Sequence, residues 1–291
     1  MAALFRDAAT DSFPALVSVK PSRRVVRRDK TQIRTMKKIS LFALALASLV
    51  INSSAAKTNF AAQVISYHPG TGAAAGFTNT SAVLGEPSRV NPFGDAVEPF
   101  NPPYRPVQLL SIGAGGFVTI KFDKPVEDKS KNPFGLDFIL FGNTGFIVTN
   151  DFDPITYESI GTPATDGSTF GNSTGATRVS VSKDGEKWYV LDPALAPVAD
   201  GLFPTDGAGD FRVPTQPGLT AAHFAGATVE DIREFYASSG GGTGYDIAWA
   251  RKANGKKADL SSIRYVRVEV LSGRAELDGF VEVDAPKRQG R

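Results

Sequence analysis

Short runs of alternating apolar and polar residues dominate this sequence, and their two-residue period restricts its fold more than any other feature. The alternation is clear in residues 116–122 and 177–182, and it returns in residues 263–271. Residues 136–141 form a short, largely apolar run between two glycines, as in a strand buried on both faces. The sequence therefore predicts many short β-strands.

An Asp-Gly pair marks the first expected hairpin. Asp184 and Gly185 stand between the second of these runs and a strand-like run at 187–191. Asp-Gly is a strong hairpin signal, because a type I′ turn needs positive φ at both central residues. A second pair of strands is predicted at residues 263–271 and 275–284.

Only one segment has a helical pattern. Thr228 stands at the N-cap position with Asp231 three residues later, an acidic variant of the capping box, and the apolar stripe ends at Tyr236. Long polar loops separate the strands at residues 69–106, 150–176 and 192–220. Many short strands, Gly- and Pro-rich connections and one short helix predict an all-β protein, an antiparallel β-sandwich with long loops.

The charge of the chain is divided unevenly. Residues 1–56 carry ten Lys and Arg against three Asp and Glu, whereas residues 57–291 carry twenty-two against twenty-seven. The sequence pI near 8.7 therefore reflects the N-terminal segment alone. Because the remainder is acidic, we expect no nucleic-acid partner.

The N-terminal segment has the features of an export signal. Met36 is followed by two lysines, an apolar run at 41–51 and small residues up to Ala56. We predict a signal peptide at 36–56, and a misassigned start codon explains residues 1–35. The mature chain, 57–291, is then a single β-sandwich domain without a transmembrane segment, located in the periplasm, outside the cell or at the cell surface.

Groups suited to nucleophilic catalysis are scarce. The chain has no cysteine, which excludes disulfides, thiolate metal sites and a Cys nucleophile. Its two histidines, His68 and His223, stand in no hydrolase or metalloprotease motif. We expect His68 in a turn and His223 packing or capping beside the helix, and a protein that is not an enzyme.

One loop begins like a cation site. Residues 150–153 read Asn-Asp-Phe-Asp, but the turn glycine of an EF-hand is missing and Ile155 takes the next alternate position. A looser calcium site would use Asp151, Asp153 and backbone carbonyl oxygens. The alternative is a solvated loop.

The last predicted strand carries acidic residues on one face and apolar residues on the other. The acidic set is Glu276, Asp278, Glu282 and Asp284, and the apolar set is Leu277, Val281 and Val283. We interpret the acidic face as a solvent-facing surface. The alternative is a pair of catalytic carboxyls for glycoside hydrolysis, which must converge to about 5–10 Å across a sugar.

Aromatic side chains offer a sugar-binding alternative to core packing, since a ring face complements the apolar CH face of a pyranose. Trp188 and Trp249 are either core residues or platforms of this kind. Asp246 follows a run of glycines that would let a ligand approach the backbone closely. With Asn143, which ends a predicted buried strand, Asp246 and Trp249 are the candidate ligand-binding residues.

Several segments together resemble a family of secreted bacterial cell-surface proteins: residues 117–125, 137–143, 179–189, 240–249 and 263–267. The phrase Val-Ser-x-Asp-Gly-x-x-Trp and the strand order also resemble discoidin-like, galactose-binding-like jelly rolls. The resemblance implies a non-catalytic adhesion or carbohydrate-binding module, often with a structural calcium ion. The sequence departs from the family at residues 174–176, where a Glu-Pro pair is replaced.

The function expected from the sequence is that of an exported, non-catalytic carbohydrate- or cell-surface-binding module, with calcium as the candidate cofactor. Its partner would be a glycan or another component of the cell envelope. Two alternatives stay open. One is an extracytoplasmic polysaccharide-degrading enzyme using carboxylates such as Asp246 and Asp278, and the other is a purely structural envelope protein.

Overall fold

The computed structural model describes residues 58–171 and 175–284. Within these residues the chain forms two antiparallel sheets that pack as a β-sandwich, which confirms the fold class predicted from the two-residue alternation. The predicted signal peptide at 36–56 and the extension at 1–35 lie outside the described residues.

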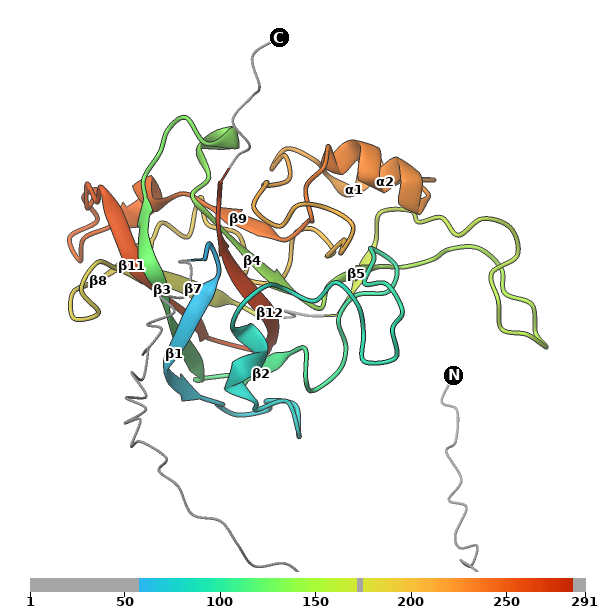
Figure 1. The fold of residues 1–291 in the computed structure, drawn as a ribbon, viewed down its shortest axis with the longest axis horizontal. Coiled ribbons are helices and arrows are strands. Elements are labelled where there is room, and N and C mark those ends of the chain that lie inside the picture. Colours follow the sequence, from blue (N-terminus) through green and yellow to red (C-terminus); the bar gives the residue numbers. More distant parts are fainter. Residues whose placement is uncertain (1–57, 172–174, 285–291) are drawn as a thin grey trace, which may run out of the picture. The chain divides into compact units, whose positions relative to one another are not determined.

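The larger sheet has six strands and the smaller sheet has four (Figure 1). In spatial order the larger sheet contains β1 (Ala61–His68), β3 (Phe117–Glu127), β11 (Ser262–Val270), β7 (Thr177–Ser182), β8 (Trp188–Leu191) and β10 (Ala250–Arg251). The smaller sheet contains β2 (Leu110–Gly113), β12 (Arg274–Glu282), β4 (Phe138–Gly142) and β9 (Thr243–Tyr245). A separate pair joins β5 (Gly145–Phe146) to β6 (Thr169–Phe170).

The main core lies between the two sheets. Alternate residues of β3, β7 and β11 point inward, and they meet the inward face of the smaller sheet. The largest contributions come from Ile120, Phe122, Val266, Val268, Phe138, Leu140, Leu277 and Phe280. The other face of the smaller sheet is also covered, by a second cluster that includes Ile139, Phe141, Val281 and Phe211.

Two α-helices follow β8, where the sequence predicted one. The predicted helix is α2 (Val229–Tyr236), and its Thr228–Asp231 capping box is present. The additional helix, α1 (Ala221–Phe224), is a single turn, too short to show an apolar period. His223 forms its capping box with Thr220, in agreement with the capping role expected of that histidine. Three 3₁₀ turns complete the elements of the described residues: η1 (Thr80–Val83), η2 (Pro133–Gly135) and η3 (Ile247–Trp249).

The β7–β8 hairpin forms where the Asp-Gly pair predicted it, with a different turn. Among the turn residues only Gly185 has positive φ, at 85°. The Asp184 carboxylate instead accepts hydrogen bonds from the backbone N–H groups of Glu186 and Lys187, at 2.9 and 2.8 Å. The loop is therefore wider than a two-residue type I′ turn.

Coverage of both faces of the smaller sheet overturns the expectation of a solvent-facing acidic surface on β12, which also contains a β-bulge. The register against β4 shifts between Leu277 and Gly279, so that Leu277 faces the main core whereas Val281 faces the second cluster. Because both faces of the smaller sheet are covered, three of its carboxyls are buried. Glu276, Asp278 and Glu282 are only 7%, 3% and 5% exposed.

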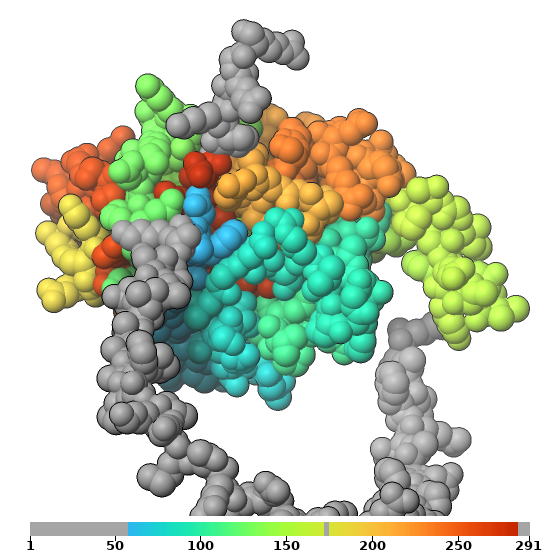
Figure 2. Space-filling model, in the orientation of Figure 1, coloured from blue at the N-terminus to red at the C-terminus, as the bar shows by residue number. Residues whose placement is uncertain are grey.

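The chain between β5 and β6 extends away from the sheets as an arm (Figures 1 and 2). Apolar side chains along it are exposed, including Ile155 at 84% and Tyr157 at 80%. No helix within the described residues is long and apolar enough to span a membrane.

Candidate functional site

The outward side of the six-stranded sheet carries a group of ring-bearing and cationic side chains. We call Phe117, Lys121, Trp188, Tyr265 and Arg267 the outer-face cluster. All five are half-buried, and they come from the three strands β3, β11 and β8. Strand pairing places Lys121, Tyr265 and Trp188 in one cross-strand row, and Arg267 lies two residues further along β11.

Small residues on β7 allow this cluster to form across a strand. Ser182 pairs with Tyr265 on one side and with Trp188 on the other, so β7 lies between the two rings. Ser180 and Ser182 are buried, and their short side chains leave the space above β7 to the Trp188 ring. The ring centroids of Trp188 and Tyr265 are 6.5 Å apart, edge to face.

Arg267 is held at the centre of the cluster. Its guanidinium carbon lies 4.4 Å from the centroid of Trp188 and 5.1 Å from that of Phe117. Its Nε donates a hydrogen bond of 2.9 Å to Oγ1 of Thr119. Two cation–π contacts and one hydrogen bond fix the plane of the guanidinium. Its terminal nitrogens form no hydrogen bond or ion pair with another described residue.

A hollow of about 350 Å³ adjoins the cluster where β3 bulges away from β11. It is lined by Gln63, Lys121, Asp123 and Arg264, together with Ala62. Lys121 also lies 5.6 Å from the Tyr265 ring. Within the part of the chain that the structure describes, neither Lys121 nor Arg264 forms an ion pair.

A second hollow, of about 590 Å³, is less suited to binding a charged ligand. Its two arginines already have carboxylate partners: Arg89 pairs with Glu86 at 2.7 Å, and Arg212 pairs with Asp210 at 2.8 Å. Arg89 also packs on the Phe211 ring. The hydrogen-bond donors of this hollow are therefore largely used within the protein.

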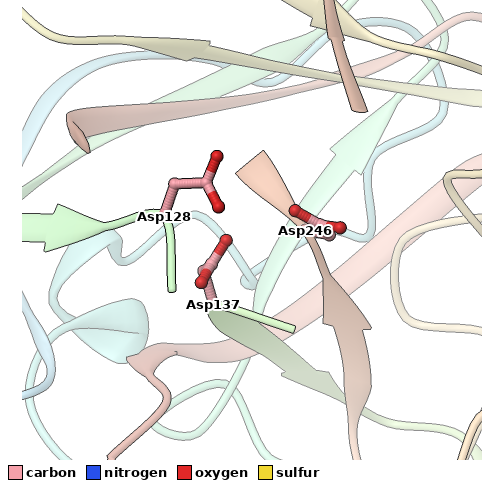
Figure 3. Close-up of side chains that lie close together, drawn as sticks. All are labelled: Asp128, Asp137 and Asp246. Atoms are coloured by element: carbon pink, nitrogen blue, oxygen red, sulfur yellow. The ribbon is translucent and has the colours of Figure 1, made fainter. Parts of the chain in front are cut away.

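Among the described residues, three aspartates form a group of acidic side chains that could hold a metal ion (Figure 3). One oxygen each of Asp128, Asp137 and Asp246 lies within 4.8 Å of the others. Asp128 follows β3, Asp137 precedes β4 and Asp246 follows β9. Pairing of Phe138 with Tyr245 brings the last two together. In the described chain no Lys or Arg forms an ion pair with any of the three.

The electrostatics of this aspartate group fit a cation. Burial raises the pKa of Asp137 to about 6, although backbone N–H groups of Lys129 and Ile247 donate to its carboxylate. Burial likewise raises the pKa of Asp246. Calcium prefers oxygen ligands, about six to eight in number, so backbone carbonyls and water would have to complete such a site.

The aspartates predicted to bind calcium lie elsewhere, on the arm between β5 and β6. The Asp153 carboxylate caps its own loop by accepting hydrogen bonds from the N–H groups of Ile155 and Thr156, and these bonds lower its pKa. Asp151 is exposed beside it. Among the described residues, no third carboxylate forms a group with Asp151 and Asp153 that could hold a metal ion.

The three predicted ligand-binding residues are not gathered in one place. Asn143 follows β4 and Asp246 follows β9, and because these strands are antiparallel the two residues lie at opposite ends of the pair. The Asn143 side chain donates to the buried Glu276 carboxylate. Trp249 packs against the main core, edge to face with Tyr245 at 6.4 Å. Only Asp246 adjoins a candidate site, that of the three aspartates.

The carboxylates proposed for a hydrolase also lie in separate surroundings. Asp278 accepts hydrogen bonds from the Ser88 N–H and hydroxyl, at 2.7 and 2.8 Å, and burial raises its pKa to about 7. Asp246 belongs to the aspartate group, with no hydrogen-bond partner in common with Asp278. Asp200, which was not among the carboxylates of the hydrolase alternative, is also buried, and this burial raises its pKa well above the usual range.

Sequence reasoning missed most of the outer-face cluster. The sequence makes Trp188 a candidate platform but gives Lys121, Tyr265 and Arg267 no binding role, because they lie on the polar side of strands whose other side is apolar. Their signal was present, since each stands at the alternate position of a strand whose other face is apolar. What the sequence lacks is the order of the strands, which brings β8 close to β11.

Comparisons with known proteins leave the family of this chain open. No family model matches it, and no curated protein matches it. Among solved structures it is similar to a pectin-binding carbohydrate-binding module, with a TM-score of 0.22 and 8% identity, over 63% of this chain and 76% of that one. A likeness at this TM-score shows nothing about function. The resemblance to secreted cell-surface proteins stays a prediction.

Proposed function

We propose that this protein is a non-catalytic carbohydrate-binding module whose binding surface is the outer-face cluster with its adjoining hollow. The observation that supports the proposal is Arg267, a guanidinium fixed between two aromatic rings with its terminal N–H groups unused within the described chain. Rigid strands present it at the surface, which reduces the entropy cost of binding.

The chemistry of the surface favours an acidic sugar. The faces of Trp188 and Phe117 are already in contact with Arg267, so the surface offers fixed cationic donors more than bare rings. A guanidinium matches a carboxylate in shape and forms paired hydrogen bonds with it. Lys121 and Arg264, which form no ion pair within the described residues, add two cations in the neighbouring hollow, which Asp123 also lines. The expected ligand is therefore a polysaccharide that contains uronic acids.

Export and calcium belong to the same proposal. The signal peptide predicted at 36–56 would deliver the module to the cell envelope or beyond, where polysaccharides are found. A calcium ion would bind at Asp128, Asp137 and Asp246 and would tie together the ends of β3, β4 and β9. In that position it would stabilise the sandwich without contacting the sugar.

A glycan array tests the proposal. The array should contain neutral, uronic acid-containing and sulfated glycans, and a single-stranded oligonucleotide should be tested beside it, with and without calcium. We expect binding to the uronate glycans by the wild type, and its loss in Arg267→Ala. Binding of neutral glycans alone would refute the acidic-sugar preference. Equal binding of the oligonucleotide would indicate a general polyanion surface, and an array without any signal would refute the function.

A further inference from the structure

Three side chains with complementary reactivity meet where the described chain enters the sandwich. Nζ of Lys124, on β3, lies 3.3 Å from Oδ1 of Asn59 and 2.8 Å from Oε2 of Glu282, on β12. An amine, a carboxamide and a carboxylate are thus in direct contact. The three come from segments far apart in the sequence.

The backbone holds these three residues in register. The N–H of Glu282 donates to the carbonyl oxygen of Asn59 at 2.7 Å, and the next residue, Phe60, bridges to Val281. Lys124 lies in the part of β3 that bulges away from β11. The contact is therefore set by strand pairing as well as by side-chain rotamers.

One of the three side chains carries a buried atom that has no hydrogen-bond partner among the described residues. This atom is Nδ2 of Asn59, whereas Oε2 of Glu282 is held by its ion pair with Lys124. The side chain of Glu282 is 7% exposed and that of Lys124 is 32% exposed. An unpartnered buried amide nitrogen is unfavourable in a folded protein. If Nδ2 of Asn59 left in a reaction, the unfavourable burial of this nitrogen would be removed.

We propose that Lys124 and Asn59 form an intramolecular isopeptide bond with Glu282 as the proton carrier. The Glu282 carboxylate takes a proton from the Lys124 ammonium, and the neutral Nζ attacks Cγ of Asn59. The Nζ–Cγ amide bond forms, the Cγ–Nδ2 bond breaks, and Nδ2 leaves as ammonia. Of the three ammonium protons, one stays on the new amide, one leaves with ammonia and one is released to water. No oxidant or cofactor is consumed.

The bond would supply a covalent staple to a chain that has no cysteine. It would join the segment that precedes the edge strand β1 to β3, beside β12 of the opposite sheet. Like a disulfide, it would restrict the unfolded chain and so raise the thermal midpoint. This inference is independent of the carbohydrate-binding proposal, because none of the three residues belongs to the outer-face cluster.

Intact-mass spectrometry of the purified protein, after its N-terminus has been sequenced, tests the bond. We expect the wild type to be lighter than its sequence by one ammonia, and a fragment in which Lys124 is joined to Asn59. Lys124→Arg keeps the positive charge but lacks the nucleophile, and it should show the full mass. Glu282→Gln should also show the full mass.

Lys129→Arg is the matched control, since Lys129 pairs with the exposed Glu127 and should not affect the mass loss. A wild type at its full sequence mass would refute the bond. So would a mass loss that persists in Lys124→Arg, because it would indicate a cyclic imide at an asparagine. Lys124→Arg retains a cationic partner for Glu282, so the test does not depend on whether Glu282→Gln folds.

Discussion

Single residues in this protein show how burial, rather than sequence spacing, decides what a carboxyl does. Asp278 was expected to face solvent on an alternating strand, yet it is 3% exposed and hydrogen-bonded to Ser88. The capping residues were predictable, because Thr228 and Asp231 act within one helical turn. The environment of Asp278 could not be predicted in this way. It depends on a bulge in β12 and on a loop that is far away in the sequence.

Asp278 should make stability depend on pH. Its pKa is raised to about 7 in the folded state, against about 4 in the unfolded chain. Between these values the folded state holds the proton that the unfolded state has lost, so the free energy of unfolding falls as pH rises from about 4 to about 7. The fall due to this group is on the order of 3 kcal/mol.

Asp278→Asn tests this dependence, because the amide keeps the shape of the carboxyl and does not titrate. Urea unfolding of both proteins at several pH values should show a smaller fall in the variant across this interval, whereas other buried acids affect both proteins alike. Parallel pH profiles for the two proteins would contradict the assignment.

The aspartate group predicts a response to calcium. If calcium binds only to the folded state, a calcium concentration one hundred times the dissociation constant adds about 2.7 kcal/mol to the free energy of unfolding. This raises the thermal midpoint by several degrees. Asp246→Asn should abolish the rise. Asp151→Asn, on the arm, should leave it intact. A rise that is lost only in Asp151→Asn would restore the site predicted from the sequence, and no rise in the wild type would exclude both.

Individual elements were predicted better than their faces. The alternating runs became strands β3, β7 and β11, and the Asp-Gly hairpin formed between β7 and β8. The face of β12 was predicted incorrectly because one bulge between Leu277 and Gly279 exchanges inside and outside. A bulge leaves no clear mark in a sequence that alternates on both sides of it.

The turn of the β7–β8 hairpin should be sensitive to a side chain at Gly185. Gly185 has a φ of 85°, and an added Cβ would lie 3.2 Å from the Tyr265 ring. Gly255 has a similar φ of 79° with open space around it. Both alanine variants should lose about 1 kcal/mol of stability, because alanine is unfavourable in the left-handed backbone conformation. Gly185→Ala should lose more, because its Cβ also crowds the Tyr265 ring.

Thermal unfolding of the two variants separates these causes. A lower midpoint for Gly185→Ala than for Gly255→Ala is the expected result. Equal midpoints would show that Tyr265 moves aside without cost, and the outer-face cluster would then be less rigid than its contacts indicate.

At the scale of the whole molecule, the sequence predicted the class of fold but not its sites. The outer-face cluster combines residues from β3, β8 and β11, and the aspartate group combines the ends of β3, β4 and β9. Both depend on how strands separated by long loops pair with one another, which alternation within each strand does not determine. Local patterns place residues on faces, whereas strand order decides which faces meet.

Calorimetric titration of a uronate oligosaccharide into the protein tests the central claim most directly. The wild type should bind it, and Arg267→Ala should lose affinity by roughly 10- to 100-fold, because charge-assisted hydrogen bonds contribute about 1.5–3 kcal/mol. Arg105→Ala is the matched control, since Arg105 also stacks on two aromatic rings, Phe93 and Tyr104, and is not part of the outer-face cluster. Its affinity should equal that of the wild type. Equal affinity in Arg267→Ala, or no binding by the wild type, would contradict the account.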